Sequence, residues 1–112
     1  MMISDLALPL QDMEAASAKA AALMRALSNR QRLLLLCHLA ASGELSVGAL
    51  VERLELSQSA LSQHLAKLRE EGLVSFRREA QTLHYSIADP AALRVLELLH
   101  ELYCPELGGP AD

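Results

Sequence analysis

The spacing of apolar residues changes at Gly72, and this change is the strongest constraint on the fold. Before it, leucines at positions 61, 65 and 68 have the i, i+4, i+7 spacing of one helix face. After it, residues 73–78 and 83–87 are typical of two strands around a turn at 79–82, whose type the residues leave open. The chain therefore requires a fold that joins a helical segment directly to a β-hairpin.

The helices are predicted from residues that favour helix ends. A capping box of Ser28 and Gln31 marks the start of the second helix. We expect helices at 12–27, 28–41, 46–54, 57–71 and 89–103, with N-caps at Ser28, Ser46, Ser57 and Asp89 and terminal glycines at Gly43 and Gly72. The order of elements predicts a mainly α fold with a small β-hairpin, a winged helix-turn-helix (α-α-α-α-β-β-α).

The length and composition fit one small domain. The chain has 112 residues, is 52% hydrophobic and carries a net charge of −4, which argues against disorder. Its longest strongly apolar run, 33–37, is much shorter than the about 20 residues of a membrane span. We expect the domain at 11–104 and flexible tails at 1–10 and 105–112. No basic region precedes an apolar stretch, so we expect no signal peptide and a cytoplasmic protein.

The first and last helices carry apolar stripes suited to neighbouring helices. The last helix has two such stripes, Ala92/Leu96/Leu99/Tyr103 and Val95/Leu98/Leu102. One stripe faces the core of the domain, and a second copy of the chain is the economical cover for the other. Residues 33–37 are apolar nearly all round their helix, so we expect that helix, with Cys37, to be buried.

Only the middle of the chain has a net positive charge, +1 over residues 56–88, against −1 over 1–55 and −4 over 89–112. A local face of this kind suffices for nucleic acid. One side of the predicted helix 57–71 is polar, with Gln58, Ser59, Ser62, Gln63 and Lys67. Ser and Gln reach base edges, and the cations Lys67, Arg69, Arg77 and Arg78 suit phosphates. An ordinary solvated surface is the alternative interpretation.

The run LSQSALSQHLAKLREEGLV from Leu56 to Val74, with RREAQTLHYSI after it, closely resembles the ArsR/SmtB family of bacterial repressors. The resemblance spans about Asp12 to Cys104. It implies a homodimer formed by the first and last helices and bound to a pseudo-palindromic operator in double-stranded DNA. It also implies a DNA-reading helix and a wing, with base-reading candidates at Gln58, Ser59, Ser62, Gln63 and His64 and wing contacts at Arg77, Arg78 and Gln81. His64 lies at the helix flank, where contact with DNA and packing against the hairpin are both open.

The metal-sensing patterns of that family are incomplete here. Ser46 and Gly48 occupy the positions where the family has two cysteines, and Ala91 occupies an expected histidine position. Soft metals would therefore lose their thiolate ligands. A metal-responsive repressor with a non-standard site in the last helix, from Glu97, His100, Glu101 and Cys104, is the alternative function; a solvated acidic face is the plainer interpretation.

Cys37 and Cys104 are the two cysteines of the chain. Taken singly, each is an ordinary small hydrophobe or terminal thiol. Together with the segments EAQT and LLHELYC, they resemble the persulfide- and redox-sensing branch of the family. That resemblance implies a reactive sulfur species or oxidant as the inducer. This inducer would join the two cysteines in an intramolecular disulfide or polysulfide bridge, and the bridged repressor would leave its operator.

Other function classes lack their motifs. The chain has no Cys-x-x-Cys, no phosphate-binding loop and no nucleophile elbow, so we expect neither an enzyme nor a cofactor. A thiol oxidoreductase and an interaction module that does not bind DNA are the remaining rivals. Turnover of a disulfide substrate would support the first, and failure to retard any promoter fragment at low salt would support the second.

Overall fold

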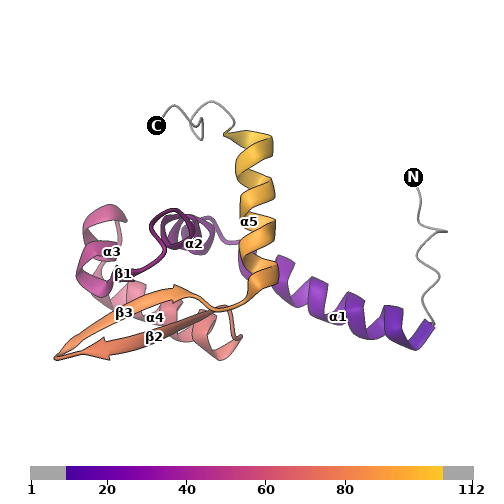
Figure 1. Ribbon diagram of the computed structural model, residues 1–112, viewed down its shortest axis with the longest axis horizontal. Coiled ribbons are helices and arrows are strands. Elements are labelled where there is room, and N and C mark those ends of the chain that lie inside the picture. Colours follow the sequence, from indigo (N-terminus) through magenta and orange to yellow (C-terminus); the bar gives the residue numbers. More distant parts are fainter. Residues whose placement is uncertain (1–9, 105–112) are drawn as a thin grey trace.

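The computed structural model describes residues 10–104 and confirms the predicted order of helices and hairpin (Figure 1). The elements are α1 (Leu10–Leu27), α2 (Arg30–Ser42), β1 (Leu45–Ser46), α3 (Val47–Arg53), α4 (Gln58–Glu70), β2 (Val74–Glu79), β3 (Thr82–Ile87) and α5 (Pro90–Tyr103). The tails predicted at 1–10 and 105–112 lie outside the described residues, except that Leu10 already belongs to α1. No helix within 10–104 is long and apolar enough to cross a membrane.

Three of the four predicted N-caps are confirmed. The side chains of Ser46, Ser57 and Asp89 accept hydrogen bonds from backbone N–H groups of the first helical turn, at 3.1, 3.0 and 2.9 Å. Gly43 and Gly72 end α2 and α4 with φ angles of 83° and 78°, the left-handed region that favours glycine.

The predicted cap at Ser28 is wrong by one residue. The Ser28 hydroxyl donates to the Arg25 carbonyl at 2.8 Å and so belongs to the end of α1. Asn29 caps α2 instead, since its side-chain oxygen accepts from the Arg32 N–H at 3.0 Å. The Arg32 side chain donates back to the Ala26 carbonyl at 2.9 Å, which ties the two helix ends together.

This assignment predicts a difference in stability between two neighbouring substitutions. Asn29→Ala removes the cap of α2 and is expected to cost about 1 kcal/mol, or roughly 4–8 °C in melting temperature for a domain of this size. Ser28→Ala serves as the matched control and is expected to change the melting temperature much less. Thermal unfolding at one fixed protein concentration measures both. The reverse order of effects would restore the predicted cap at Ser28.

The sheet has three strands in the order β1-β3-β2. The hairpin pairs Val74 with Ile87 at its base and Glu79 with Thr82 at its tip. Its turn includes Ala80 at a φ of 57°. The third strand, β1, pairs Leu45 with Tyr85 and was not predicted from the sequence. Two residues are too short to show the alternation by which strands are recognised.

Leucine makes up most of the buried core, and no polar or charged residue within 10–104 is buried. The large side chains that are almost fully buried are Leu35, Leu36, Leu39, Leu50, Leu61, Leu65, Leu68 and Val74. They come mainly from α2 and α4, so these two helices form the centre of the domain. Only one side of α2 contributes, however, because Leu34 is 38% exposed and Cys37 is exposed. The prediction of an all-round buried α2 is therefore wrong.

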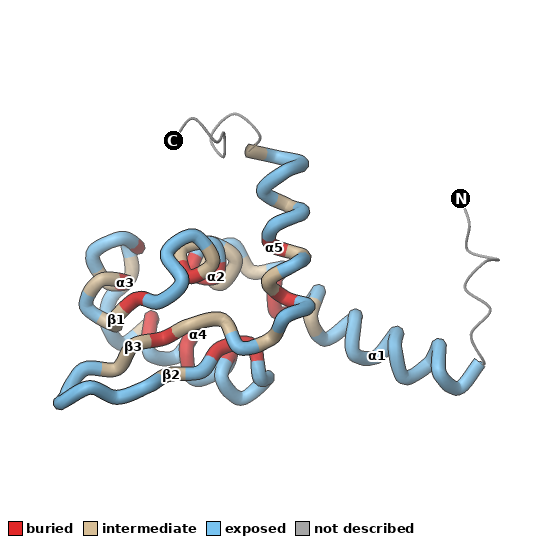
Figure 2. The backbone as a smooth tube through the Cα atoms, viewed as in Figure 1, coloured by how far each residue is buried: buried red, intermediate tan, exposed pale blue. Residues whose placement is uncertain are grey.

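Two helices project from this body. In Figure 1, α1 and the far end of α5 extend away from the wing and the other helices, and Figure 2 shows α1 exposed along most of its length. The Cα radius of gyration is 16.1 Å. A compact domain of about 100 residues would have roughly 13 Å. The apolar stripe of α1 is thus largely open to solvent in the single chain. On α5, Ala92 and Leu96 face the core, as predicted for one stripe, whereas Leu98 and Leu102 of the other stripe are exposed.

Candidate nucleic-acid interface and thiol pair

The side of α4 that faces away from the core carries the predicted base-reading residues. Ser57 caps the helix, and Leu61, Leu65 and Leu68 turn one face into the core. On the other side Gln58, Ser59, Ser62, Gln63 and Lys67 are all exposed, whereas His64 is half-buried at the flank. This helix therefore presents hydroxyl and amide groups to a base edge, with one lysine beside them.

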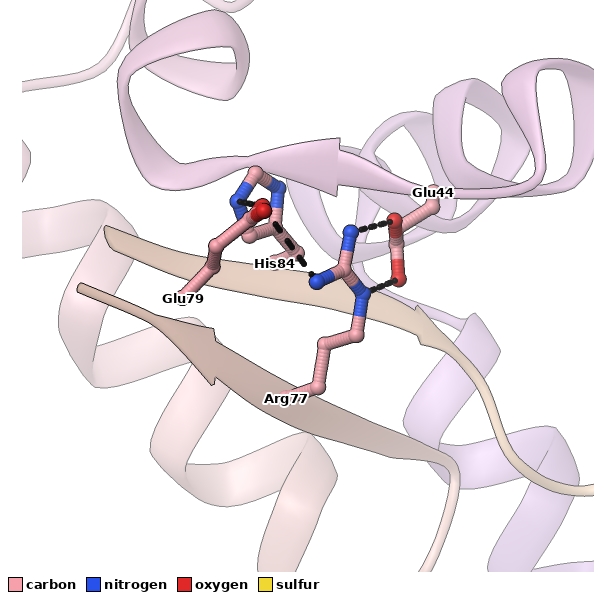
Figure 3. Close-up of polar contacts among 4 residues, drawn as sticks. All are labelled: Glu44, Arg77, Glu79 and His84. Atoms are coloured by element: carbon pink, nitrogen blue, oxygen red, sulfur yellow. Dashed lines mark hydrogen bonds and ion pairs between the residues drawn. The ribbon is translucent and has the colours of Figure 1, made fainter. Parts of the chain in front are cut away.

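The wing residues Arg77, Arg78 and Gln81 are exposed as well. Arg77 already has partners, however. Its Nε and Nη2 atoms donate to the two carboxylate oxygens of Glu44 at 2.8 and 2.9 Å, and its Nη1 atom lies 3.4 Å from a carboxylate oxygen of Glu79 (Figure 3). The hydrogen bond from Arg77 holds the pKa of the Glu44 carboxyl below its usual range. Glu44 was not identified from the sequence, because its proximity to Arg77 depends on the unpredicted strand β1.

A second arginine fixes the wing against α4. The Arg69 guanidinium lies 4.8 Å from the centre of the Phe76 ring, and that ring packs against Tyr85 at 5.4 Å between centres. Arg69 was predicted to contact the DNA backbone, and the structure gives it this cation–π contact on the wing. A cleft of about 960 Å³ separates α3 and α4 from the wing tip, with Gln58, Ser62 and Gln81 among its lining residues.

Cys37 lies on α2 and Cys104 ends α5, and these two helices pack against each other. Cys37 lines a hollow of about 470 Å³ together with Leu96, Glu97 and His100. Cys104 is the C-cap of α5, and its N–H donates to the His100 carbonyl at 2.8 Å. Both thiols are free.

Two features of its surroundings raise the pKa of the Cys37 thiol. Although the residue as a whole is exposed, local desolvation in the hollow raises the pKa of its thiol, and the negative charge of Cys104 raises that pKa further. This charge acts between residues of two helices, since Cys37 lies on α2 and Cys104 ends α5. Cys37 is thus not the buried small hydrophobe that the surrounding leucines suggested.

The alternative metal site gains no support from one chain. Glu97, His100 and Glu101 lie together on α5, but nowhere in residues 10–104 do three His, Cys, Asp or Glu side chains converge to hold a metal ion.

Comparison with known proteins identifies the family. Residues 29–75 match the family described as "Bacterial regulatory protein, arsR family". The chain is 57% identical to the transcriptional activator HlyU of Vibrio cholerae over 95 residues. This match covers 85% of the chain and 87% of HlyU. The chain is 42% identical over 97 residues to the biofilm growth-associated repressor of Agrobacterium fabrum, covering 87% and 82%.

Solved structures agree with this assignment. Reduced HlyU from Vibrio cholerae has a TM-score of 0.79 and 56% identity, over 84% of this chain and 98% of that chain. The transcriptional repressor BigR from Xylella fastidiosa has a TM-score of 0.77 and 35% identity, over 87% and 98%. The chain therefore belongs to the ArsR family and is a winged-helix, DNA-binding transcriptional regulator rather than an enzyme.

Proposed function

We propose that the protein is a cytoplasmic, homodimeric repressor that leaves its operator when Cys37 and Cys104 are joined by a disulfide or polysulfide bridge. The observation that carries this proposal is the packing of α2, which bears Cys37, against α5, which ends at Cys104, and the charge of Cys104 raises the pKa of Cys37. A relative named as a repressor and a relative whose solved structure is described as reduced support the two halves of the proposal.

The DNA-binding half of the proposal places α4 in the major groove. Gln58, Ser59, Ser62, Gln63 and His64 then read base edges, Lys67 contacts the backbone, and Arg77, Arg78 and Gln81 on the wing contact the adjacent minor groove. A twofold dimer would present two such helices to half-sites about 34–36 Å apart, so the operator is expected to be a pseudo-palindrome.

The dimer is proposed to form through α1 and α5. Several large apolar side chains of these helices are exposed in the single chain, with Leu98 at 51%, Leu102 at 61% and Met24 at 61%. Monomeric proteins rarely expose contiguous apolar patches beyond a few hundred Å². A second copy would cover both projecting helices at once.

The bridge can form without a cofactor. A cysteine thiolate attacks the outer sulfur of a persulfide RSSH, which gives a protein persulfide and releases RSH. The second thiolate attacks the inner sulfur of that persulfide, which forms the Cys37–Cys104 disulfide and releases H₂S. The two cysteines are oxidised, and the sulfane sulfur is reduced to sulfide. Longer polysulfide donors would leave one or more sulfur atoms in the bridge.

The bridge would act on DNA through the position of α5. It ties α2, which packs in the core, to the end of a helix that we place in the dimer interface. A changed angle between the subunits alters the distance between the two copies of α4, which must match fixed half-sites. Allosteric couplings of about 1–3 kcal/mol change affinity about 5–150-fold, enough for derepression.

The test combines DNA binding with intact mass. Reduced protein is used to select an operator from random-sequence duplexes, and its affinity is measured before and after treatment with a persulfide donor or with peroxide. We expect treated protein to bind more weakly and to have lost two hydrogens, or to have gained sulfur atoms between the cysteines. Unchanged operator affinity in protein that has formed the bridge would refute the proposed switch.

The raised pKa of Cys37 also leads to a prediction about how its alkylation rate depends on pH. Because the pKa of Cys37 is raised, its thiolate is scarce near neutrality, and alkylation should accelerate roughly tenfold per pH unit there. Cys104→Ser removes the thiolate that raises this pKa, so at alkaline pH, where thiols ionise, Cys37 should have a lower pKa and be alkylated faster at a given pH. Mass spectrometry of alkylated protein follows the rate. Identical pH profiles with and without Cys104 would show that the two thiols are not in contact.

A further inference from the structure

The outer face of the wing carries a cluster of charges in which acidic groups outnumber the arginine. Both oxygens of Glu44 accept from Arg77, Glu79 approaches the same guanidinium, and His84 lies 3.5 Å from Glu79 (Figure 3). Two carboxylates around one guanidinium leave this cluster with a net charge of −1 when His84 is neutral. The Arg77 and Glu44 side chains are 54% and 38% exposed, so both are accessible from solvent.

The geometry of the pair sets up a competition. Glu44 accepts from the Nε–Nη2 edge of the guanidinium, the planar fork that also binds a phosphate in two parallel hydrogen bonds. A phosphate that takes this edge must displace the carboxylate and then remain near it, since Glu44 is attached to β1. Arg77 therefore has an intramolecular partner of the same charge and geometry as its proposed ligand.

We propose that Glu44 limits the affinity of this protein for DNA by competing with phosphate for Arg77. This inference rests on the DNA-binding face proposed above. It assigns to Glu44 a role that neither its charge nor its place in the sequence suggested: it adjusts a phosphate contact without touching DNA. An exposed ion pair contributes little to folding stability, so the pair can exchange partners without disturbing the wing.

The salt dependence of binding provides the test. Glu44→Gln keeps the shape of the side chain and frees Arg77. We expect it to bind a random-sequence duplex of about 30 base pairs, enough for two half-sites, more tightly. The gain should be roughly three- to tenfold at low salt, with a slope of log K against log[salt] steeper by about 1.8 for the dimer, from one phosphate contact per subunit. All measurements use reduced protein, and thermal unfolding checks that each variant is folded.

Two controls separate this role from a general change of charge. Glu55→Gln removes the same charge from an exposed residue that forms no ion pair within 10–104, and it should leave the slope unchanged. In an Arg77→Gln background, Glu44→Gln should have no effect. Weaker binding of Glu44→Gln, or an effect that persists without Arg77, would overturn the inference. Failure of the unmodified protein to bind any duplex would instead refute the DNA-binding face itself.

Discussion

The double variant Cys37→Ser, Cys104→Ser is expected to remain bound to its operator after treatment with a persulfide donor. The unmodified protein should lose about 5–150-fold in operator affinity under the same treatment, the range of typical allosteric couplings. The double variant should change less than about twofold, because no covalent link between α2 and α5 can form. Fluorescence anisotropy of a labelled operator duplex, with and without donor, measures the difference.

The single variants refine this result. Cys37→Ser and Cys104→Ser each retain one thiol, so each can form a persulfide but not a bridge, and both should stay bound to DNA. Serine is close to cysteine in size, and Cys37 is exposed, so we expect reduced unmodified protein and all three variants to melt alike. Release of the double variant by the donor would show that the trigger lies elsewhere in the protein.

The double variant Leu98→Glu, Leu102→Glu is expected to lose dimer formation and most of the operator affinity. These side chains are 51% and 61% exposed in the single chain, so charge at these positions should not disrupt the core. In the dimer they would place charge at an apolar interface, where desolvation without a partner is strongly unfavourable. A monomer contacts only one half-site, and we expect a loss of about a hundredfold or more.

A substitution on the polar side of the same helix supplies the control. Arg94→Glu changes the net charge by −2, the same change as the two leucine substitutions together, and Arg94 is exposed. It should leave the protein dimeric in size-exclusion chromatography with light scattering. A leucine double variant that remains a dimer with full operator affinity would place the subunit interface on another surface.

The sequence predicted those parts of the fold that depend on local signals. Ser57 and the leucines at 61, 65 and 68 determine which side of α4 faces outward, and the structure confirms that side residue by residue. The caps at Ser46 and Asp89 are local hydrogen bonds and were equally predictable. Ser28 and Asn29 are both good caps, so the choice between them depended on how α1 ends.

The features that escaped prediction depend on distant parts of the chain. Glu44 and Arg77 are 33 residues apart and meet only because β1 joins the sheet beside β3. The exposure of Cys37 depends on how α2 is rotated against α5, which the run of leucines around it conceals. Cys104 ends α5, which packs against α2, and sequence alone implied its pairing with Cys37 only through a family resemblance.

The core built almost entirely from one kind of side chain has a consequence for the proposed switch. The buried leucine side chains of α2, α4 and α5 are equal in volume and form no hydrogen bonds. Movement of one helix therefore breaks no side-chain hydrogen bond in the core. Cores of a single apolar residue type specify their packing loosely and tolerate rearrangement. A new covalent bridge between Cys37 and Cys104 would therefore shift α5 by part of a side-chain width while the core stays packed. The protein would change its affinity for DNA without unfolding.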